Sequence, residues 1–224
     1  MTDENKETEK HEDFLNEQKL EQHEVHEVLV FLQNNGVSII LTLAIGVAAA
    51  FGLLFYRNGL KRKAEYAARA LTDARTPEAL MAVTKEYAGT VSAPIALLKL
   101  AAQKFSEGAY DEAFAKYEEF KNTYPDHGVA LAAAVCMVEC QEAAGKFDAA
   151  IAAADTFISD NPDHFMTPVA IFTKARCYEQ SGDLEKAREV YENFMAKNSD
   201  DAWSVRADSS LRYVKQRIRA AEKK

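Results

Sequence analysis

Residues that could carry out chemistry are few in this sequence and lie far apart. His23 and His26 are three residues apart, close enough to share one helix face and hold a metal ion. Both lie in a strongly acidic leader, where a solvated histidine is far more common than a metal ligand, so we predict no metal site. No glycine-rich phosphate loop, His-Glu-x-x-His or Gly-x-Ser-x-Gly motif occurs. We therefore expect no enzymatic activity, no cofactor and no small-molecule substrate.

A repeat of 37 residues organises the second half of the chain. Six-residue stretches that begin with glycine and end with alanine start at Gly108, Gly145 and Gly182. The same interval separates three aromatic residues: Phe120, Phe157 and Phe194. A period between about 20 and 50 residues is typical of a solenoid, in which each unit buries its apolar side by stacking on a neighbour. Such a protein offers an extended surface rather than a catalytic pocket.

Each unit encodes two helices joined by a tight turn, and residues 94–127 illustrate the pattern. Pro94 suits a helix start, because its missing N–H would be unpaired there in any case. An apolar face at helical spacing follows, made by Leu97, Leu98, Ala101, Ala102 and Phe105. Gly108 then ends the first helix, and Pro125 ends the second.

This order of helix, glycine turn, helix and proline resembles the tetratricopeptide repeat. The matching positions are the small residue of the first helix, the turn glycine, the alanine at the helix crossing and the terminal proline: Ala101, Val138, Ala175, Gly108, Gly145, Gly182, Ala113, Ala150, Ala187, Pro125 and Pro162. Val138 is large for its place, and Ser199 stands where a third proline belongs. The phenylalanines resemble those of repeats in bacterial envelope proteins. The resemblance implies an all-α, right-handed solenoid of three repeats over residues 94–201.

The ends of the repeat region are atypical, as the terminal units of a solenoid are expected to be. Residues 57–93 keep the phase at Leu80 and Val83 but have Leu71 in place of the turn glycine. Residues 202–224 carry apolar residues on one helical face and arginine and lysine on the opposite face. We predict a degenerate first unit and a C-terminal cap helix.

The three cysteines, Cys136, Cys140 and Cys177, all fall within the repeats. The first two are four residues apart on one predicted helix, and the last two are one repeat apart. Neither spacing suits a disulfide, because the side chains would be badly oriented or too distant. We interpret all three as small apolar core residues.

An uncharged stretch of 20 residues, 37–56, precedes the repeats. As a helix it would be about 30 Å long, which matches the hydrocarbon core of a bilayer. Tyr56 and Arg57 close it with side chains suited to an interface. A buried core helix and a cleaved signal peptide are the alternatives. Because the leader is long and lacks a basic segment, we expect a retained single-pass anchor.

The leader before this stretch has two parts. Residues 1–27 hold ten acidic residues and three lysines, a net charge of −7. We expect residues 1–24 to form a disordered tail. From Val25 apolar residues recur at helical spacing, so residues 25–36 are predicted to form an amphipathic helix on the lipid surface.

Small residues four apart occur within the predicted span. Gly46 is paired in this way with Ala50, and Ala48 with Gly52. Such spacing allows close approach of a second helix. It therefore makes a homodimer, or packing against a partner's membrane helix, an open expectation.

The full layout resembles a narrower family, the YfgM-like ancillary subunit of the bacterial Sec translocon. The resemblance rests on the acidic leader, the sequence Phe-Leu-Gln-Asn-Asn-Gly at 31–36, the single span and the repeats. It implies a single-pass protein of the inner membrane with a cytoplasmic N-terminus and periplasmic repeats. It also implies SecYEG, periplasmic chaperones and exported proteins as partners, and no catalytic residue.

The basic residues beside the span favour the opposite orientation. On the leader side the only basic residue within about 20 positions is Lys19. The other side carries five: Arg57, Lys61, Arg62, Lys63 and Arg69. The positive-inside rule would leave the repeats in the cytoplasm. We expect the periplasmic placement on the family resemblance, with a cytoplasm-facing adaptor as the alternative.

A scaffold for cell division, or for outer-membrane or cell-wall assembly, is a further alternative, since similar repeats serve those roles too. Nucleic acid is not an expected partner, because the sequence has no basic stripe of the required kind. The expected partners are therefore proteins, together with the membrane lipid around the span.

In tetratricopeptide proteins the first helices of the repeats line the concave face, where ligands usually lie. Mapping those positions onto this chain predicts a protein-binding surface: Ile95, Leu98, Ala102, Phe105, Ala132, Val135, Glu139, Glu142, Val169, Phe172, Arg176 and Glu179. Its apolar end would bind an amphipathic or partly unfolded segment. The alternative is that Ile95, Leu98 and Phe105 pack as plain core against residues 57–93.

Overall fold

The structure is a computed structural model that describes residues 3–198 and 202–223. Two compact units divide the chain, at residues 1–62 and 63–224. The described part of the first unit is helical throughout and belongs to α1 (Asp3–Asp73). This differs from the expected disordered tail and separate amphipathic helix, since one helix runs from Asp3 onwards. Glutamate and lysine are frequent there, and both are good helix formers.

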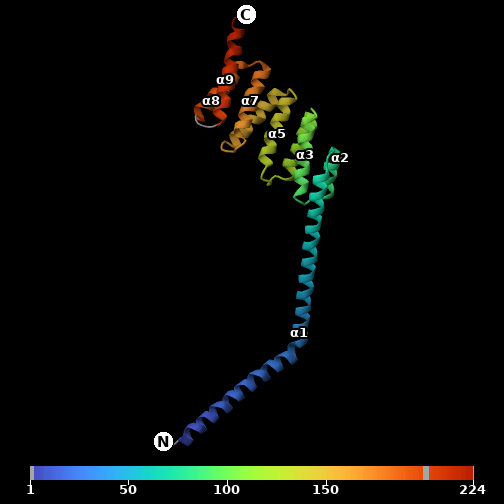
Figure 1. Ribbon diagram of the computed structural model, residues 1–224, viewed down its shortest axis with the longest axis vertical. Coiled ribbons are helices and arrows are strands. Elements are labelled where there is room, and N and C mark those ends of the chain that lie inside the picture. The colour runs from blue at the N-terminus through green and yellow to red at the C-terminus, as the bar shows by residue number, and fades with distance from the viewer. Residues whose placement is uncertain (1–2, 199–201, 224) are drawn as a thin grey trace. The chain divides into compact units, whose positions relative to one another are not determined.

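The second unit stacks helices in chain order (Figure 1). After the last turns of α1 come α2 (Pro77–Glu86), α3 (Ser92–Ser106), α4 (Tyr110–Thr123), α5 (Ala130–Ala143), α6 (Phe147–Asp160), α7 (Thr167–Ser181), α8 (Leu184–Lys197) and α9 (Ala202–Ala221). From α2 on, each helix packs against the next, and α5 also contacts α7. All regular secondary structure in the described ranges is helical, which confirms the predicted all-α solenoid.

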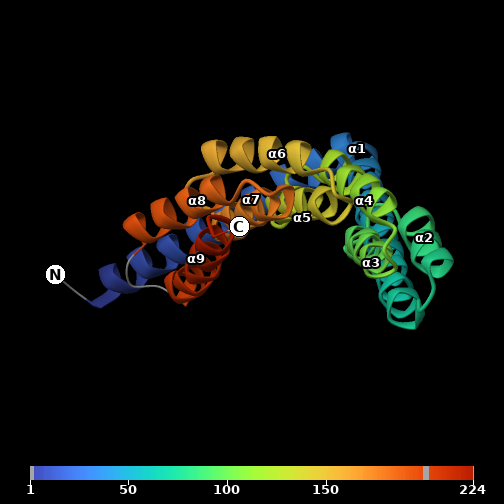
Figure 2. The same cartoon turned by 90° about the horizontal axis from the view of Figure 1, so that it is seen from above.

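Within this unit the helices form two rows, seen most clearly in Figure 2. Helices α3, α5, α7 and α9 form an inner row, and α2, α4, α6 and α8 form an outer row. Each repeat of 37 residues therefore supplies one inner and one outer helix. The first inner helix begins at Ser92, two residues before the predicted start at Pro94.

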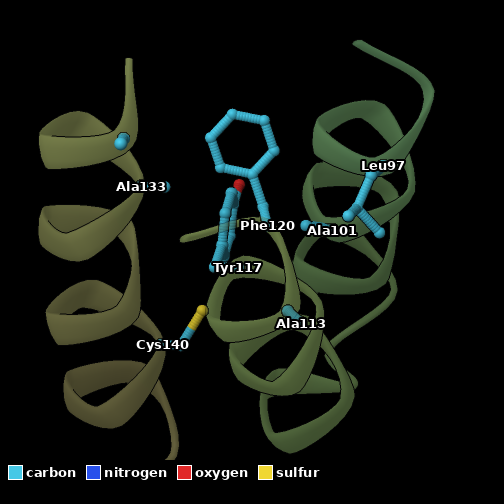
Figure 3. Close-up of a cluster of buried hydrophobic side chains, with 8 residues drawn as sticks. Leu97, Ala101, Ala113, Tyr117, Phe120, Ala133 and Cys140 are labelled. Atoms are coloured by element: carbon cyan, nitrogen blue, oxygen red, sulfur yellow. The ribbon is translucent and has the colours of Figure 1, made fainter. Parts of the chain in front are cut away.

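The core between the rows is built from the small and aromatic positions of the repeat. Figure 3 shows Tyr117 and Phe120 of α4 between Ala101 of α3 and Ala133 of α5. Phe120 and Ala101 have no exposed surface. The alanines let the neighbouring helices approach the rings, whose burial stabilises the fold by about 2–3 kcal/mol each. Equivalent aromatic residues fill the next two repeats.

Glycine makes the tight turn from inner to outer helix in each full repeat. Gly108, Gly145 and Gly182 have φ angles of +79°, +73° and +89°. An L-residue with a side chain rarely adopts this left-handed conformation, so glycine is needed there. These are the three turn glycines predicted from the repeat.

Histidine stabilises two of the turns that lead from an outer helix to the next inner helix. The Nδ1 atom of His127 accepts a hydrogen bond from the Val129 backbone at 3.4 Å. One repeat later, Nδ1 of His164 accepts one from the Met166 backbone at 3.2 Å. Both histidines therefore hold the turn in which they lie.

The two ends of the solenoid are closed differently. At the start, Leu80 and Val83 of α2 pack on the first inner helix in a small cluster that also contains Ala96 and Leu100. Thr76 caps α2 by accepting a hydrogen bond from the Ala79 backbone at 3.2 Å. At the other end, α9 covers α7 and α8 with its one apolar face.

Candidate functional site

The inner helices leave one face open, and the repeat arranges it in rows. On α3 the exposed residues form a single helical stripe of Ile95, Lys99, Ala102 and Ser106. The equivalent positions on α5, α7 and α9 are Ala132, Cys136, Glu139, Ala143, Val169, Thr173, Arg176, Gln180, Arg206, Ser210, Tyr213 and Arg217. All of these except Thr173 are at least partly exposed. We call these positions the inner face.

Half of the residues predicted to bind protein lie on this inner face: Ile95, Ala102, Ala132, Glu139, Val169 and Arg176. The other half turn towards neighbouring helices: Leu98, Phe105, Val135, Glu142, Phe172 and Glu179. Val135 and Phe172 are core residues, with exposed fractions of 0% and 2%. The predicted surface has Leu98 as the next residue after Ile95, whereas in the structure the next exposed residue of the stripe is Lys99. One residue is about 100° of helix rotation, enough to move a side chain from the open face into the packing.

A charged network joins α5 to α7 beside the inner face. Arg176 donates to both carboxylate oxygens of Glu142, from Nε to Oε1 at 2.7 Å and from Nη2 to Oε2 at 2.5 Å. Gln180 donates to the same Oε1 atom at 2.8 Å. Glu142 is only 8% exposed, so its charge is compensated within the protein. The bond to Glu142 also raises the pKa of Arg176.

Glu139 lies one turn before Glu142 and is half-buried. Burial raises the pKa of Glu139; the Arg176 charge opposes this rise, and the Glu142 charge adds to it. No hydrogen bond to its carboxylate is found within residues 3–198 and 202–223. The carboxylate can therefore accept a cationic side chain from a bound partner.

The cap helix α9 extends the inner face with arginine and aromatic residues. The Arg206 guanidinium lies 5.5 Å from the ring centre of Phe172 and 5.6 Å from that of Trp203. Arg217 lies 5.8 Å from the ring centre of Tyr213. Such stacking holds a cation in place while leaving its N–H groups available.

Glu179, one of the predicted residues, is held within the framework rather than presented to a partner. The hydroxyl of Tyr191 donates to its Oε1 atom at 2.9 Å. Arg217 approaches its Oε2 atom at 4.0 Å. These contacts tie α7 to α8 and α9.

Sequence reasoning missed Lys99 on α3 and the whole stripe on α9. The signal for the second omission was present. The 37-residue interval that relates Ile95 to Ala132 and Val169 leads next to Arg206. The prediction for residues 202–224 is a cap helix that lies outside the three repeats, so the mapped binding positions stop at Glu179.

The tetratricopeptide repeat-like domain family matches residues 30–197. The chain belongs to this family. Members of a repeat family of this kind stack helix pairs into extended binding surfaces, in agreement with the inner face described above. A comparison with curated proteins gives no sequence match.

Solved tetratricopeptide repeat-like structures share the fold at low sequence identity. A variant of nearly identical TPR-like repeats from Podosopora anserina is 19% identical, with a TM-score of 0.53, and covers 73% of this chain and 88% of its own. Residues 41 to the end of MamA from Desulfovibrio magneticus RS-1 are 17% identical, with a TM-score of 0.51, and cover 71% and 85%. A tetratricopeptide repeat protein from Parabacteroides merdae is 15% identical, with a TM-score of 0.51, and covers 74% and 64%. These likenesses concern the fold alone.

The matched region also takes in a helical stretch suited to a membrane. Within the described residues, Gln33–Asp73 is the one stretch long and apolar enough to cross a bilayer, judged by length and composition. The predicted span, 37–56, lies inside it. Gly46, Ala48, Ala50 and Gly52 are all exposed on α1. A Cβ atom added at either glycine would meet nothing within 4 Å.

Proposed function

We propose that this protein is a membrane-anchored scaffold that captures segments of other proteins on its inner face. The observation that carries the proposal is the register of four inner helices, which repeats the same stripe at equal intervals. Tetratricopeptide-like repeats generally serve as protein-interaction scaffolds. The role is non-enzymatic, and α1 supplies the anchor.

The residues of the inner face define the chemistry of the expected ligand. Its first row begins with the apolar residues Ile95, Ala132 and Val169. Two turns further along the helices, Glu139 and Arg176 are half-buried neighbours. An amphipathic segment would place apolar side chains on the first row and a basic side chain towards Glu139.

We assign exported proteins at the Sec translocon as the clients of this scaffold. Support comes from the combination of an acidic leader, one apolar stretch and a short tetratricopeptide solenoid in one chain. In this role the repeats stand on the periplasmic side of the inner membrane, beside SecYEG and periplasmic chaperones.

Site-specific photo-crosslinking in cells tests the capture surface. A photoreactive residue is placed at Lys99 on the inner face and, as a matched control, at Asn122 on the outer helix α4; both positions are exposed. We expect crosslinks to translocon subunits and exported chains from Lys99 alone. Equal crosslinking from both positions would reject the inner face. Recovery of division or cell-wall proteins without translocon subunits would reject the Sec assignment.

The orientation needs its own test, because five basic residues follow the span and favour a cytoplasm-facing adaptor. A reporter that is active only outside the cytoplasm is fused after Lys224. Activity is expected. A silent reporter, together with an active one fused before the leader, would place the repeats in the cytoplasm and remove the proposed role.

A further inference from the structure

Two equivalent grooves open on the outer side of the solenoid, away from the inner face. The first groove lies between α4 and α6, with α5 as its floor, and has a volume of about 340 Å³. The second lies between α6 and α8, with α7 as its floor, and has a volume of about 220 Å³. Eight lining positions of the first groove recur in the second, one repeat of 37 residues later. The two grooves are therefore successive copies of one site.

The first groove is mainly apolar. Phe114 and Met137 are half-buried in it, and Leu131 is 41% exposed. Its wall also contains Gln141, whose Oε1 atom is buried without a hydrogen-bond partner among the described residues. A buried carbonyl oxygen without a hydrogen bond costs free energy. The amide of Gln141 can turn to meet a donor, because its last side-chain torsion has broad minima. The groove thus offers an apolar site with an acceptor for an N–H group.

The second groove has changed its chemistry at the same positions. Lys174 replaces Met137, and its Nζ atom lies 2.5 Å from Asp155. Lys197 replaces Asp160 and makes no ion pair within the described residues. The replacement of an acid by a lysine makes this groove suited to a carboxylate.

We propose that the two grooves together bind an extended peptide segment with a large apolar side chain and a carboxylate about three residues apart. The helices that form the floors of the two grooves, α5 and α7, contact each other. Packed helices lie about 8–10 Å apart, and an extended chain rises about 3.3 Å per residue, so about three residues bridge the distance between the floors. The apolar side chain fills the first groove, a backbone N–H donates to Gln141, and the carboxylate pairs with Lys197. This surface is separate from the inner face and does not depend on the function proposed for it.

Fluorescence anisotropy with the full-length protein in detergent micelles tests the proposal. The probe is a labelled peptide, Gly-Ser-Leu-Ser-Ser-Glu-Ser-Gly. We expect saturable binding that is at least ten-fold weaker when leucine is replaced by serine or glutamate by lysine. Absence of binding by the parent peptide, or equal binding of all three peptides, would overturn the proposal.

Two variants locate the bound peptide. Met137→Lys copies the second groove into the first, where Glu118 occupies the position equivalent to Asp155 and can pair with the new lysine. Lys197→Glu reverses the charge in the second groove. Each variant is expected to weaken peptide binding at least ten-fold without changing the melting temperature. Lys99→Glu on the inner face is expected to leave peptide binding unchanged. Binding that responds to Lys99→Glu but to neither groove variant would assign the peptide to the inner face and overturn the proposal.

Discussion

Arg176 is the side chain that compensates the buried charge between α5 and α7. Replacing it with methionine leaves the Glu142 carboxylate, which is 8% exposed, with Gln180 as its remaining partner. We expect Arg176→Met to cost about 2 kcal/mol, because a hydrogen-bonded charge loses its counterion. This corresponds to a fall of about 4–8 °C in the thermal midpoint, measured by circular dichroism. The double variant with Glu142→Leu should recover most of the loss; additive losses would show that the pair is not coupled.

Glu139 gives the stability of the solenoid a pH dependence of its own. Its folded-state pKa is raised above the ordinary 4.5, mainly by burial, so the native state holds its proton more tightly than the unfolded chain. The folded form therefore loses stability as pH rises from about 4.5 through the raised pKa, and remains penalised at neutral pH. We expect Glu139→Gln to raise the thermal midpoint at pH 7. The gain should vanish below pH 4.5, and a gain that persists there would have another cause.

At the level of helices and turns, the glycines differ in what they are needed for. Gly145 has a φ angle of +73°, whereas Gly128 has no positive φ angle, and a Cβ atom at either would meet nothing within 4 Å. Gly145→Ala should therefore destabilise the fold by about 1–2 kcal/mol through the backbone alone. Gly128→Ala should be close to neutral. Thermal unfolding of the two variants measures the difference, and equal effects would contradict this account.

The existence and order of the helices could be predicted because their signals are local. A turn glycine such as Gly108, an alanine at a helix crossing and a buried aromatic residue recur at a fixed interval, and each acts through its own backbone or immediate neighbours. The open stripe could not be predicted in the same way. Leu98 and Lys99 are adjacent on one helix, and only the packing of α4 and α5 decides which side is covered. In the same way, the groove between α4 and α6 exists only once three helices have packed.

For the repeat domain as a whole, the cap helix determines whether the last repeat is covered. Leu211 and Val214 of α9 bury Phe172, Tyr191 and Phe194 in one cluster. A chain that stops after Lys197 should expose these rings, lose several kcal/mol of stability and self-associate. A chain that stops after Ala221 retains all of α9 and is the control. Size-exclusion chromatography and binding of a hydrophobic dye would distinguish them, and equal behaviour would show that the cap is dispensable.

The all-α repeat architecture could be predicted from the 37-residue period, whereas the relation of the chain to a membrane could not. The repeat lies within 63–224, whereas the proposal of a membrane anchor rests on the length and composition of α1 alone. The basic residues after the predicted span favour a cytoplasmic repeat domain, whereas the resemblance to a translocon subunit favours a periplasmic one, and neither argument rests on packing. Partner identity lies further still from the sequence, because the inner face specifies a chemistry rather than a protein.

The buried cysteines can report local opening of the solenoid. Burial raises the pKa of Cys140 and of Cys177 to about 12, so neither thiol reacts while its helix is in place. Cys140 lies in α5 and Cys177 in α7, one repeat apart. The rate at which each cysteine is alkylated by a thiol reagent therefore measures how often its own repeat opens. If the solenoid frays from its ends, the two labelling rates will differ and will respond separately to Gly145→Ala. If it opens in one step, Cys140 and Cys177 will be labelled together.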